Sequence, residues 1–301
     1  MKKVLITGGS GLIGRSLGKK LSEKGYQVAI LSRLGKKGDE AAIYHWDPEK
    51  DHMDEGALRG IGYIVHLAGA DIGGKRWTAK RKREIADSRV RSGELIFDRI
   101  RKLDRKPAAF ITASATGYYG ARTTEEVYSE SSPPFDDFLG QTCSRWERTA
   151  DLFSDIGIRT VKIRTGIVLT GEGGILSRIG PFFRMGLGAS PGNGKQYLPW
   201  IHMEDLCNIY IHAMENEKVS GTFNAVAPEH ATFGEFAMKL AGSVNTKIRM
   251  PNIPAPLVRL VLGSMSDMLL YGSRVSSGRI EEAGYSFIFP DLDSALKEIY
   301  A

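Results

Sequence analysis

Three glycines near the start of the chain have the spacing of a loop that binds phosphate groups. In KVLITGGSGLIGRSLGKKLSEKG (residues 3–25) they stand in the pattern G-x-x-G-x-x-G. Glycine lets the backbone turn sharply and approach a pyrophosphate, and the unpaired N–H groups that begin the next helix bind that anion. The pattern predicts a dinucleotide site, with a tight turn that binds no ligand as the alternative. From this loop the predicted contacts are Gly8, Ser10, Gly11, Leu12, Ile13 and Gly14.

The residues after the second apolar run, QVAIL (27–31), indicate which dinucleotide is bound. An NAD site usually has a carboxylate here that holds the ribose hydroxyls. This chain continues with Ser32 and Arg33, and no carboxylate follows in LSRLGKK (31–37). A carboxylate would repel a 2′-phosphate, whereas a guanidinium binds it through paired, charge-assisted hydrogen bonds. The sequence therefore favours NADP over NAD, with an exposed loop arginine as the alternative role of Arg33.

A β-α-β unit must position these groups, and the sequence contains one. Residues 3–7 are an apolar run typical of a buried strand, and apolar residues then recur at helical spacing from Leu12 to Leu21. Gly25 suits the end of that helix, and residues 27–31 form the next strand. With 301 residues, 42% of them hydrophobic, the chain is long enough for one large α/β unit or for two domains.

Composition also narrows the class of protein. Cys143 and Cys207 lie far apart without a C-x-x-C motif, so neither a disulfide scaffold nor a zinc site is expected, and no other cluster predicts a metal. The apolar run after MKK is too short for a signal peptide, and APLVRLVLGSMSDMLL (255–270) is interrupted by charges. We therefore expect a cytoplasmic protein that does not enter a membrane.

The charge of the chain is unevenly distributed. The formal net charge is +6, and between Lys75 and Arg91 there are eight basic residues and two acidic ones, Glu84 and Asp87. Such a run is usually a solvated helix face, and it could also attract a polyanionic cofactor or a nucleic acid. We do not expect a nucleic-acid partner from this one helix.

Four later segments resemble the extended, epimerase-like branch of the short-chain dehydrogenase/reductase superfamily. IGYIVHLAGA (61–70) is similar to the fourth strand of that branch, and FITASATGYYG (110–120) to its fifth strand and catalytic serine segment. VKIRTGIVL (161–169) is similar to the sixth strand, and LPWIHMEDL (198–206) to a later His-x-x-Asp signature. The resemblance implies a nicotinamide cofactor on a Rossmann-type fold.

A narrower resemblance covers essentially the whole chain. GGKRWTAKRKREIADSRV (73–90) and the ending GSRVSSGRIEEAGYSFIFPDLDSALKEI (272–299) are similar to NADP-binding epimerase family proteins with a C-terminal domain of unknown function. That family implies an α/β fold with a doubly wound parallel sheet, a smaller C-terminal substrate-side domain, and NADP, but no established substrate. Carried over to this sequence, the cofactor contacts are Ser32, Arg33, Leu67, Ala68, Gly69, Glu84, Arg89 and Val168.

The catalytic pair that the resemblance implies is missing. Extended reductases carry Tyr-x-x-x-Lys on the helix after the fifth strand, where lysine lowers the pKa of the tyrosine. If Glu147 marks that helix, Leu139 and Cys143 stand in place of the pair, and neither can do its work.

Nearby hydroxyl groups offer a replacement. Ser114 is expected to orient the substrate, with Tyr118 or Tyr119 as the replacement acid. The alternatives are a strand-end hydroxyl with a structural partner and aromatic rings that pack the substrate loop. His202 and Asp205 are expected to organise the fold rather than to take part in catalysis. Arg164 is expected to be a buried structural arginine, with a phosphate ligand as the alternative.

The remaining sequence predicts a second domain. Residues 171–199 are rich in glycine and contain an apolar helix, which suits a mobile segment over a substrate. We expect an NADP-binding domain from residues 1–170 and 200–228, and a substrate-side domain from 171–199 and 229–301. Arg178, Arg184 and Lys195 favour an anionic ligand such as a nucleotide-sugar, or are solvated loop cations.

Taken together, these features predict an NADP-dependent oxidoreductase or epimerase that acts on a small hydroxy or carbonyl substrate. The missing Tyr-x-x-x-Lys pair leaves a second hypothesis, an NADP(H)-binding redox sensor that acts through a partner protein. The sequence leaves the oligomeric state open.

Overall fold

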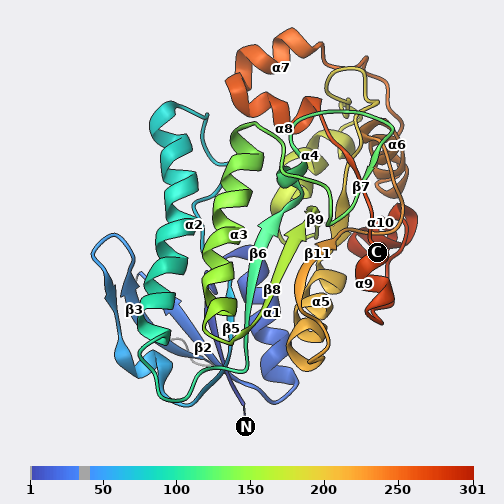
Figure 1. Cartoon of the computed structure of the whole chain (residues 1–301). Helices are drawn as coiled ribbons and strands as arrows, with labels where there is room; N and C mark the ends of the chain where they lie inside the picture. Colours follow the sequence, from blue (N-terminus) through green and yellow to red (C-terminus); the bar gives the residue numbers. More distant parts are fainter. Residues whose placement is uncertain (1, 34–40) are drawn as a thin grey trace.

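The protein is built around one large, mostly parallel sheet, seen in a computed structural model that describes residues 2–33 and 41–301 (Figure 1). The strand order is β11-β8-β6-β5-β1-β2-β3-β4, and only β3 and β4 pair antiparallel. The order reverses direction beside β1, which is the doubly wound arrangement, so the predicted fold class is confirmed. The strands are β1 Lys3–Thr7, β2 Gln27–Ser32, β3 Ala42–Asp47, β4 His52–Met53, β5 Ile61–His66, β6 Ala109–Ala115, β8 Arg159–Thr165 and β11 Gly221–Ala225.

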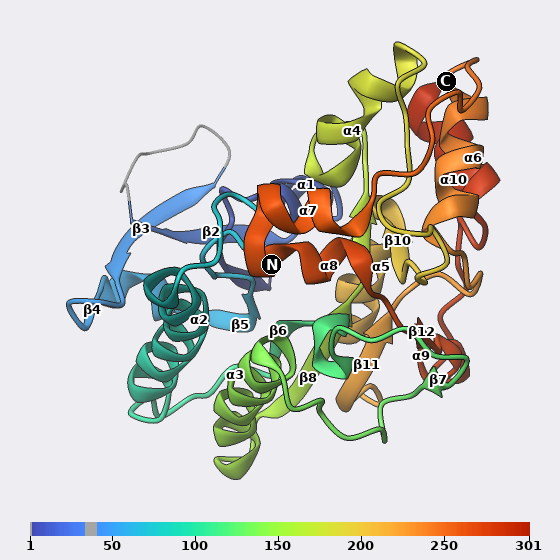
Figure 2. The ribbon, with the colours of Figure 1, turned by 90° about the horizontal axis from the view of Figure 1, so that it is seen from above.

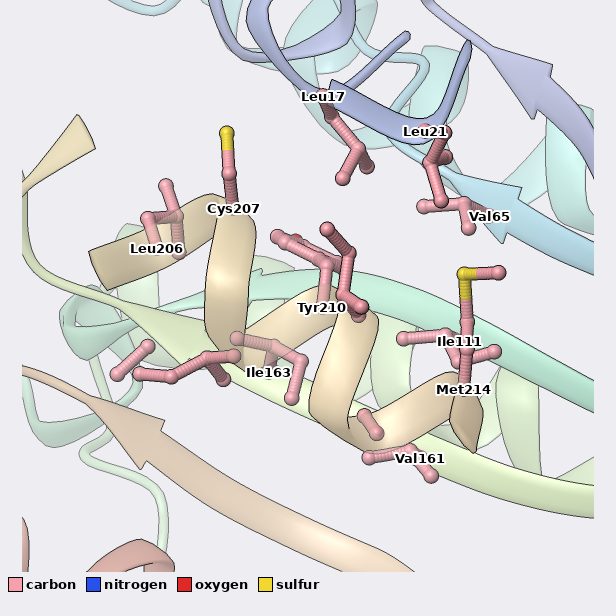
Figure 3. Close-up of a cluster of buried hydrophobic side chains, with 14 of the residues drawn as sticks. Leu17, Leu21, Val65, Ile111, Val161, Ile163, Leu206, Cys207, Tyr210 and Met214 are labelled. Carbon is pink, nitrogen blue, oxygen red and sulfur yellow. The ribbon is translucent and has the colours of Figure 1, made fainter. Parts of the chain in front are cut away.

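Helices α1 (Leu12–Glu23) and α5 (Met203–Glu215) cover one face of this sheet. Alternate residues of a strand point to opposite faces, so Val4 and Ile6 of β1 pack on this side. Figure 3 shows the resulting cluster, in which helix and strand side chains meet in one apolar layer. The labelled residues are Leu17, Leu21, Val65, Ile111, Val161, Ile163, Leu206, Cys207, Tyr210 and Met214.

Helices α2 (Ala79–Ile100) and α3 (Phe138–Asp155) cover the other face. Leu5 of β1 points to this side, where the rings of Phe110 and Phe153 stack with centroids 3.7 Å apart. Thr78 and Asp137 cap the two helices, since each side chain accepts a hydrogen bond from a backbone N–H of the first turn. None of the helices in the described part of the chain is long and apolar enough to cross a membrane.

A third apolar cluster lies beside the sheet and joins two distant parts of the chain. Leu176 and Phe183 of α4 pack with Phe236 and Leu240 of α6 and with Leu296 of α10. This cluster combines the segments that we assigned to a substrate-side domain, and that division stays a prediction. The remaining helices are α4 Gly174–Arg184, α6 Phe233–Ser243, α7 Ala255–Leu262, α8 Asp267–Leu270, α9 Gly278–Glu282 and α10 Leu292–Tyr300. Two small sheets complete the fold: β9 (Ile167–Leu169) pairs with β10 (Trp200–His202), and β7 (Val127–Tyr128) pairs with β12 (Arg274–Val275).

The chain around α9 packs against the large sheet instead. Ile280 and Tyr285 belong to the apolar cluster beneath α5. The fully buried carboxylate of Asp205 accepts hydrogen bonds from the Tyr285 hydroxyl (2.6 Å) and from the backbone N–H groups of Ile288 and Phe289. Asp205 therefore fastens the C-terminal region to α5, which is the organising role expected of it.

His202 also has a structural position. Its Nδ1 accepts a hydrogen bond from the backbone N–H of Glu204 and caps α5, and its Nε2 lies 3.0 Å from Glu298 of α10.

Figure 2 looks down on the end of the sheet where the strands finish, and α7 and α8 lie over it. Two hydrogen bonds connect this helical region to the chain before α2. Arg76 donates to the Leu260 carbonyl, and the Ser264 hydroxyl donates to the Trp77 carbonyl.

Candidate cofactor and substrate site

The glycine-rich loop between β1 and α1 is shaped for close approach of a ligand. Gly8 has φ +68°, and a Cβ there would lie 2.9 Å from the Leu67 carbonyl group. A Cβ on Gly14 would lie 2.3 Å from the Gly8 carbonyl oxygen, so both positions require glycine. Helix α1 begins at Leu12 with no capping side chain and no acidic residue in its first turn among the described residues. Its first N–H groups are therefore suited to a pyrophosphate.

Ser32 and Arg33 lie next to this loop. The parallel register pairs Thr7 with Leu31, so the end of β2 reaches the same edge of the sheet as Gly8. Ser32 is half-buried and Arg33 is exposed. The lysines that follow, Lys36 and Lys37, lie outside the described residues. The position of Arg33 fits the predicted contact with a 2′-phosphate.

A buried hydrogen-bond chain holds the loop after β5. The hydroxyl of Thr7 accepts from the backbone N–H groups of Leu67 and Ala68, both at 3.1 Å. It lies 2.8 Å from His66 Nδ1, and His66 Nε2 lies 3.3 Å from the Ser92 hydroxyl. Burial lowers the pKa of His66 to about 4, which keeps the imidazole neutral at pH 7. Thr7, His66 and Ser92 thus position the predicted cofactor residues Leu67 and Ala68, and no sequence pattern had marked these three residues.

Arg89 meets the same loop from α2. Its guanidinium donates to the carbonyls of Ala70 (3.2 Å) and Ile85 (2.8 Å) and lies 5.0 Å from the centre of the Trp146 ring. A Cβ on Gly69 would lie 2.9 Å from Arg89, so these two predicted residues are in contact. Burial lowers the pKa of Arg89, and a guanidinium remains charged at pH 7 nonetheless.

Two other predicted cofactor residues lie apart from this contact. Glu84 is on the exposed side of α2, where its carboxylate pairs with Arg81 at 2.8 Å, and this ion pair lowers its pKa. The structure therefore does not bring Glu84 together with Arg89, because residues five positions apart on a helix with 3.6 residues per turn point in different directions. Val168 lies in β9, and a Cβ on Gly174 would lie 3.2 Å from its carbonyl oxygen. The start of α4 thus reaches the cofactor edge of the sheet.

The predicted catalytic serine is a structural residue in this geometry. Ser114 is 3% exposed, and its hydroxyl donates to the Glu147 carboxylate at 2.7 Å. Glu147 forms a two-point ion pair with Arg164, at 2.8 and 2.9 Å. Ser114, Arg164 and Asn224 stand side by side on three neighbouring strands. The Ser114 hydroxyl is turned toward α3, so its contact with a substrate stays a prediction that this geometry does not support.

The two predicted catalytic tyrosines belong to the same network. Tyr119 is fully buried, and its hydroxyl donates to Asn224 (2.6 Å) and accepts from Arg164 (3.0 Å). Burial raises the pKa of Tyr119 to about 12, and burial also raises the pKa of Tyr118. The guanidinium carbon of Arg164 lies 3.4 Å from the centre of the Tyr118 ring. Tyr119 therefore cannot present its hydroxyl to a ligand, and Tyr118 packs on Arg164.

A cavity of about 330 Å³ opens on the other side of the same segment. Its walls come from the large sheet and α2 and α3 on one side, and from α8 and the segment after β9 on the other. Leu139 and Cys143 line it, at the positions where a Tyr-x-x-x-Lys pair is expected. Burial raises the pKa of Cys143 to about 12, so the thiol is neutral. The missing pair would have faced this cavity.

Polar groups that the sequence analysis missed also line the cavity. Thr116 is partly exposed and has no hydrogen-bond partner among the described residues, and Thr116 rather than Ser114 is the lining hydroxyl of its segment. Trp146 Nε1 and Gln196 Oε1 are buried and have no partner in the described part of the chain. No sequence signal distinguished them, because helical spacing marks Trp146 as a core residue and Gln196 lies in a loop.

Comparison with known proteins places the chain in a family. Residues 4–138 match the NAD dependent epimerase/dehydratase family, and residues 253–299 match a domain of unknown function. The chain is 36% identical to human epimerase family protein SDR39U1 over 99% of its own length and 100% of the relative's. It is 34% identical to epimerase family protein ML0860 of Mycobacterium leprae, over 97% of this chain and 94% of that one.

A solved structure agrees with this placement. The crystal structure of human SDR39U1 (isoform 2) with NADPH superimposes with a TM-score of 0.89 at 34% identity, over 99% of each chain. The resemblance inferred from the sequence motifs is confirmed. The chain belongs to the epimerase family proteins of the NAD-dependent epimerase/dehydratase type, in the group that includes SDR39U1.

Proposed function

We propose that the protein is an NADP-dependent oxidoreductase or epimerase that acts on a small hydroxy or carbonyl compound. The observation that carries the proposal is the cavity at the carboxyl edge of the sheet, which is lined both by residues beside the cofactor loop and by the C-terminal region. A substrate at this edge lies where ligands bind in doubly wound folds. A protein that only sensed its cofactor would have no need of such a cavity.

The residues of the glycine-rich loop and of the end of β2 fit an NADP molecule. Gly8, Gly11 and Gly14, with the free N–H groups of α1, would hold the pyrophosphate, and Arg33 after β2 would hold the 2′-phosphate. The related human protein was crystallised with NADPH, which supports the phosphorylated cofactor. When bound, NADPH supplies a hydride to the carbon of a substrate carbonyl, and that carbonyl oxygen must gain a proton to give the alcohol.

The chain's own hydroxyl groups serve the oxygen. Thr116 lines the cavity without a partner and donates a hydrogen bond to the substrate oxygen, the task expected of Ser114. Tyr271 also lines the cavity, and its hydroxyl accepts a hydrogen bond from the Arg259 guanidinium at 3.0 Å. In this proposal Tyr271 supplies the proton, because it is a phenolic hydroxyl of a residue in the cavity wall, held in place by its hydrogen bond to Arg259.

Cofactor binding is tested by titration with NADPH and NADH, followed by fluorescence. We expect NADPH to bind at least about tenfold more tightly, and Arg33→Ala to remove most of that preference. Arg101→Ala is the matched control, because this exposed arginine pairs with Asp98 at the far end of α2. Equal affinity for the two cofactors would contradict the choice of NADP.

Catalysis is tested by NADPH oxidation in the presence of carbonyl compounds. Tyr271→Phe should lower kcat by about 10²–10⁴-fold, the usual contribution of a general acid. Tyr197→Phe is the comparison variant, since Tyr197 lines the same cavity but its hydroxyl is bonded to Glu125. The assignment of the proton donor is wrong if Tyr197→Phe costs more activity than Tyr271→Phe.

A further inference from the structure

We infer that the substrate is a small, uncharged and largely apolar alcohol or carbonyl compound, and not a nucleotide-sugar or another anion. The inference rests on the proposed function, because it concerns the same cavity and names the class of molecule that the cavity accepts.

The walls of the cavity are mainly apolar. Leu139 and Ile167 line it from the sheet side, and Phe233, Met268 and Leu269 line it from the C-terminal region. Apolar surfaces of this kind bind a ligand by removing its apolar area from water. A diphosphate or a sugar would lose its hydration here without gaining enough partners in return.

The charged groups in the walls do not suit an anion. Arg89 and Asp267 are the charged side chains among the described residues that line the cavity. The Arg89 guanidinium already donates to two backbone carbonyls, and the family resemblance predicts that it contacts the cofactor. Asp267 is half-buried, its carboxylate has no ion pair among the described residues, and it would repel a phosphate or carboxylate.

The cations that could have bound an anionic substrate lie elsewhere. Arg178 donates to the Gly73 carbonyl at 2.7 Å, and Arg184 lies over the Tyr300 ring at 5.4 Å. Lys195 is exposed, and none of the three lines the cavity. The interpretation of these residues as sites for a nucleotide-sugar therefore has no support in the geometry.

The polar groups that remain suit a neutral oxygen function. The Gln196 side chain donates from Nε2 to the carbonyls of Pro191 (3.0 Å) and Leu269 (2.7 Å). Two carbonyl acceptors fix the amide orientation, so Oε1 is left as a buried acceptor. Trp146 Nε1 is a buried donor without a partner. Both atoms are covered by protein, whereas the partly exposed Thr116 hydroxyl in the same wall is open to a ligand hydroxyl or carbonyl.

The test compares matched neutral and charged ligands on the full chain loaded with NADP⁺. The neutral probes are acetophenone, cyclohexanone and octanal, and the charged ones are 4-acetylbenzoate and UDP-glucose, all followed by saturation-transfer NMR. We expect at least one neutral probe to bind, acetophenone to bind at least about tenfold more tightly than its carboxylated analogue, and UDP-glucose not to bind.

A charge reversal in the cavity sharpens the test. Asp267→Lys should reduce the affinity ratio of acetophenone to 4-acetylbenzoate by about tenfold, and Asp267→Asn should reduce it less. Glu94→Lys makes the same change of net charge on the exposed side of α2 and should leave the ratio as it is.

The substrate class is wrong if UDP-glucose or 4-acetylbenzoate binds as tightly as the neutral probes, or if none of the neutral probes binds. A failure of the proposed function gives a different result. The chain would then fail to bind NADPH in the titration, or it would bind the probes and still not oxidise NADPH in their presence.

Discussion

Two groups of polar side chains lie on either side of the segment that follows β6, and they have opposite hydrogen-bonding states. On one side, Ser114, Glu147, Arg164 and Tyr119 satisfy one another in a closed network. On the other side, Thr116, Trp146 and Gln196 line a cavity and keep groups without partners in the described chain. We call the first group the closed network.

This difference distinguishes residues that hold the fold together from residues that remain available to a ligand. The buried ion pair of Glu147 and Arg164 is hydrogen-bonded to Ser114 and Tyr119 and connects α3 to the sheet, away from solvent. On the cavity side the Thr116 hydroxyl is partly exposed and can still pair with a bound molecule. The residues with the most familiar catalytic chemistry thus belong to the closed network, and less conspicuous ones line the cavity.

The largest effect is expected from breaking the closed network. Glu147→Gln leaves the buried Arg164 guanidinium without its counter-ion and should lower the free energy of unfolding by about 3–5 kcal/mol, measured by urea denaturation. The double variant Glu147→Leu with Arg164→Met should lose less, because no unpaired charge remains. Equal losses in the single and double variants would show that the ion pair is not the cause.

A pH-dependent loss of stability is expected from the chain of Thr7, His66 and Ser92. The pKa of His66 is about 4 in the folded protein and about 6.5 when unfolded, so only the unfolded chain binds the proton between these values. The contribution of neutral His66 to the free energy of unfolding is fully present above pH 6.5. It falls as the pH drops toward 4, by about 3 kcal/mol in total. Unfolding of the wild type and of His66→Gln at pH 7 and pH 4.5 should show a smaller loss in the variant.

Cofactor binding should respond to one methyl group in the glycine-rich loop. Gly14→Ala places a Cβ 2.3 Å from the Gly8 carbonyl oxygen and should weaken NADPH binding by about 100-fold in a fluorescence titration. Gly18→Ala is the matched control in the same helix, since its Cβ would lie 3.9 Å from Ile6 and Val28. A similar loss in both variants would mean that α1 is disturbed and not the loop.

The smallest effects should separate the two hydroxyls that the comparison contrasts. Tyr119→Phe removes a buried hydrogen bond and should lower the free energy of unfolding by about 1–2 kcal/mol. Thr116→Val should change stability less and lower kcat/KM by about tenfold, because its hydroxyl has no partner in the described chain. If the two variants exchange these effects, the assignment of the two sides is reversed.

Local patterns were enough for the fold and the cofactor loop. The spacing of Gly8, Gly11 and Gly14 reports a backbone path within a few residues, and alternating apolar residues report the faces of strands. The sequence also showed that the Tyr-x-x-x-Lys pair is absent, with Leu139 and Cys143 at its positions. In the structure these two residues line the cavity. Strand alternation could even have shown that Ser114 shares a face with Phe110, toward α3.

The sequence by itself determined the first β-α-β unit, the family and the place of the phosphate-binding loop, because each depends on motifs whose residues are close together in the chain. Only the tertiary structure decided which hydroxyls are free. Ser114 and Glu147 are 33 positions apart, and Tyr119 and Asn224 are 105 apart. Whether such groups pair depends on how α3 and β11 pack against the sheet, and no short-range pattern contains that information.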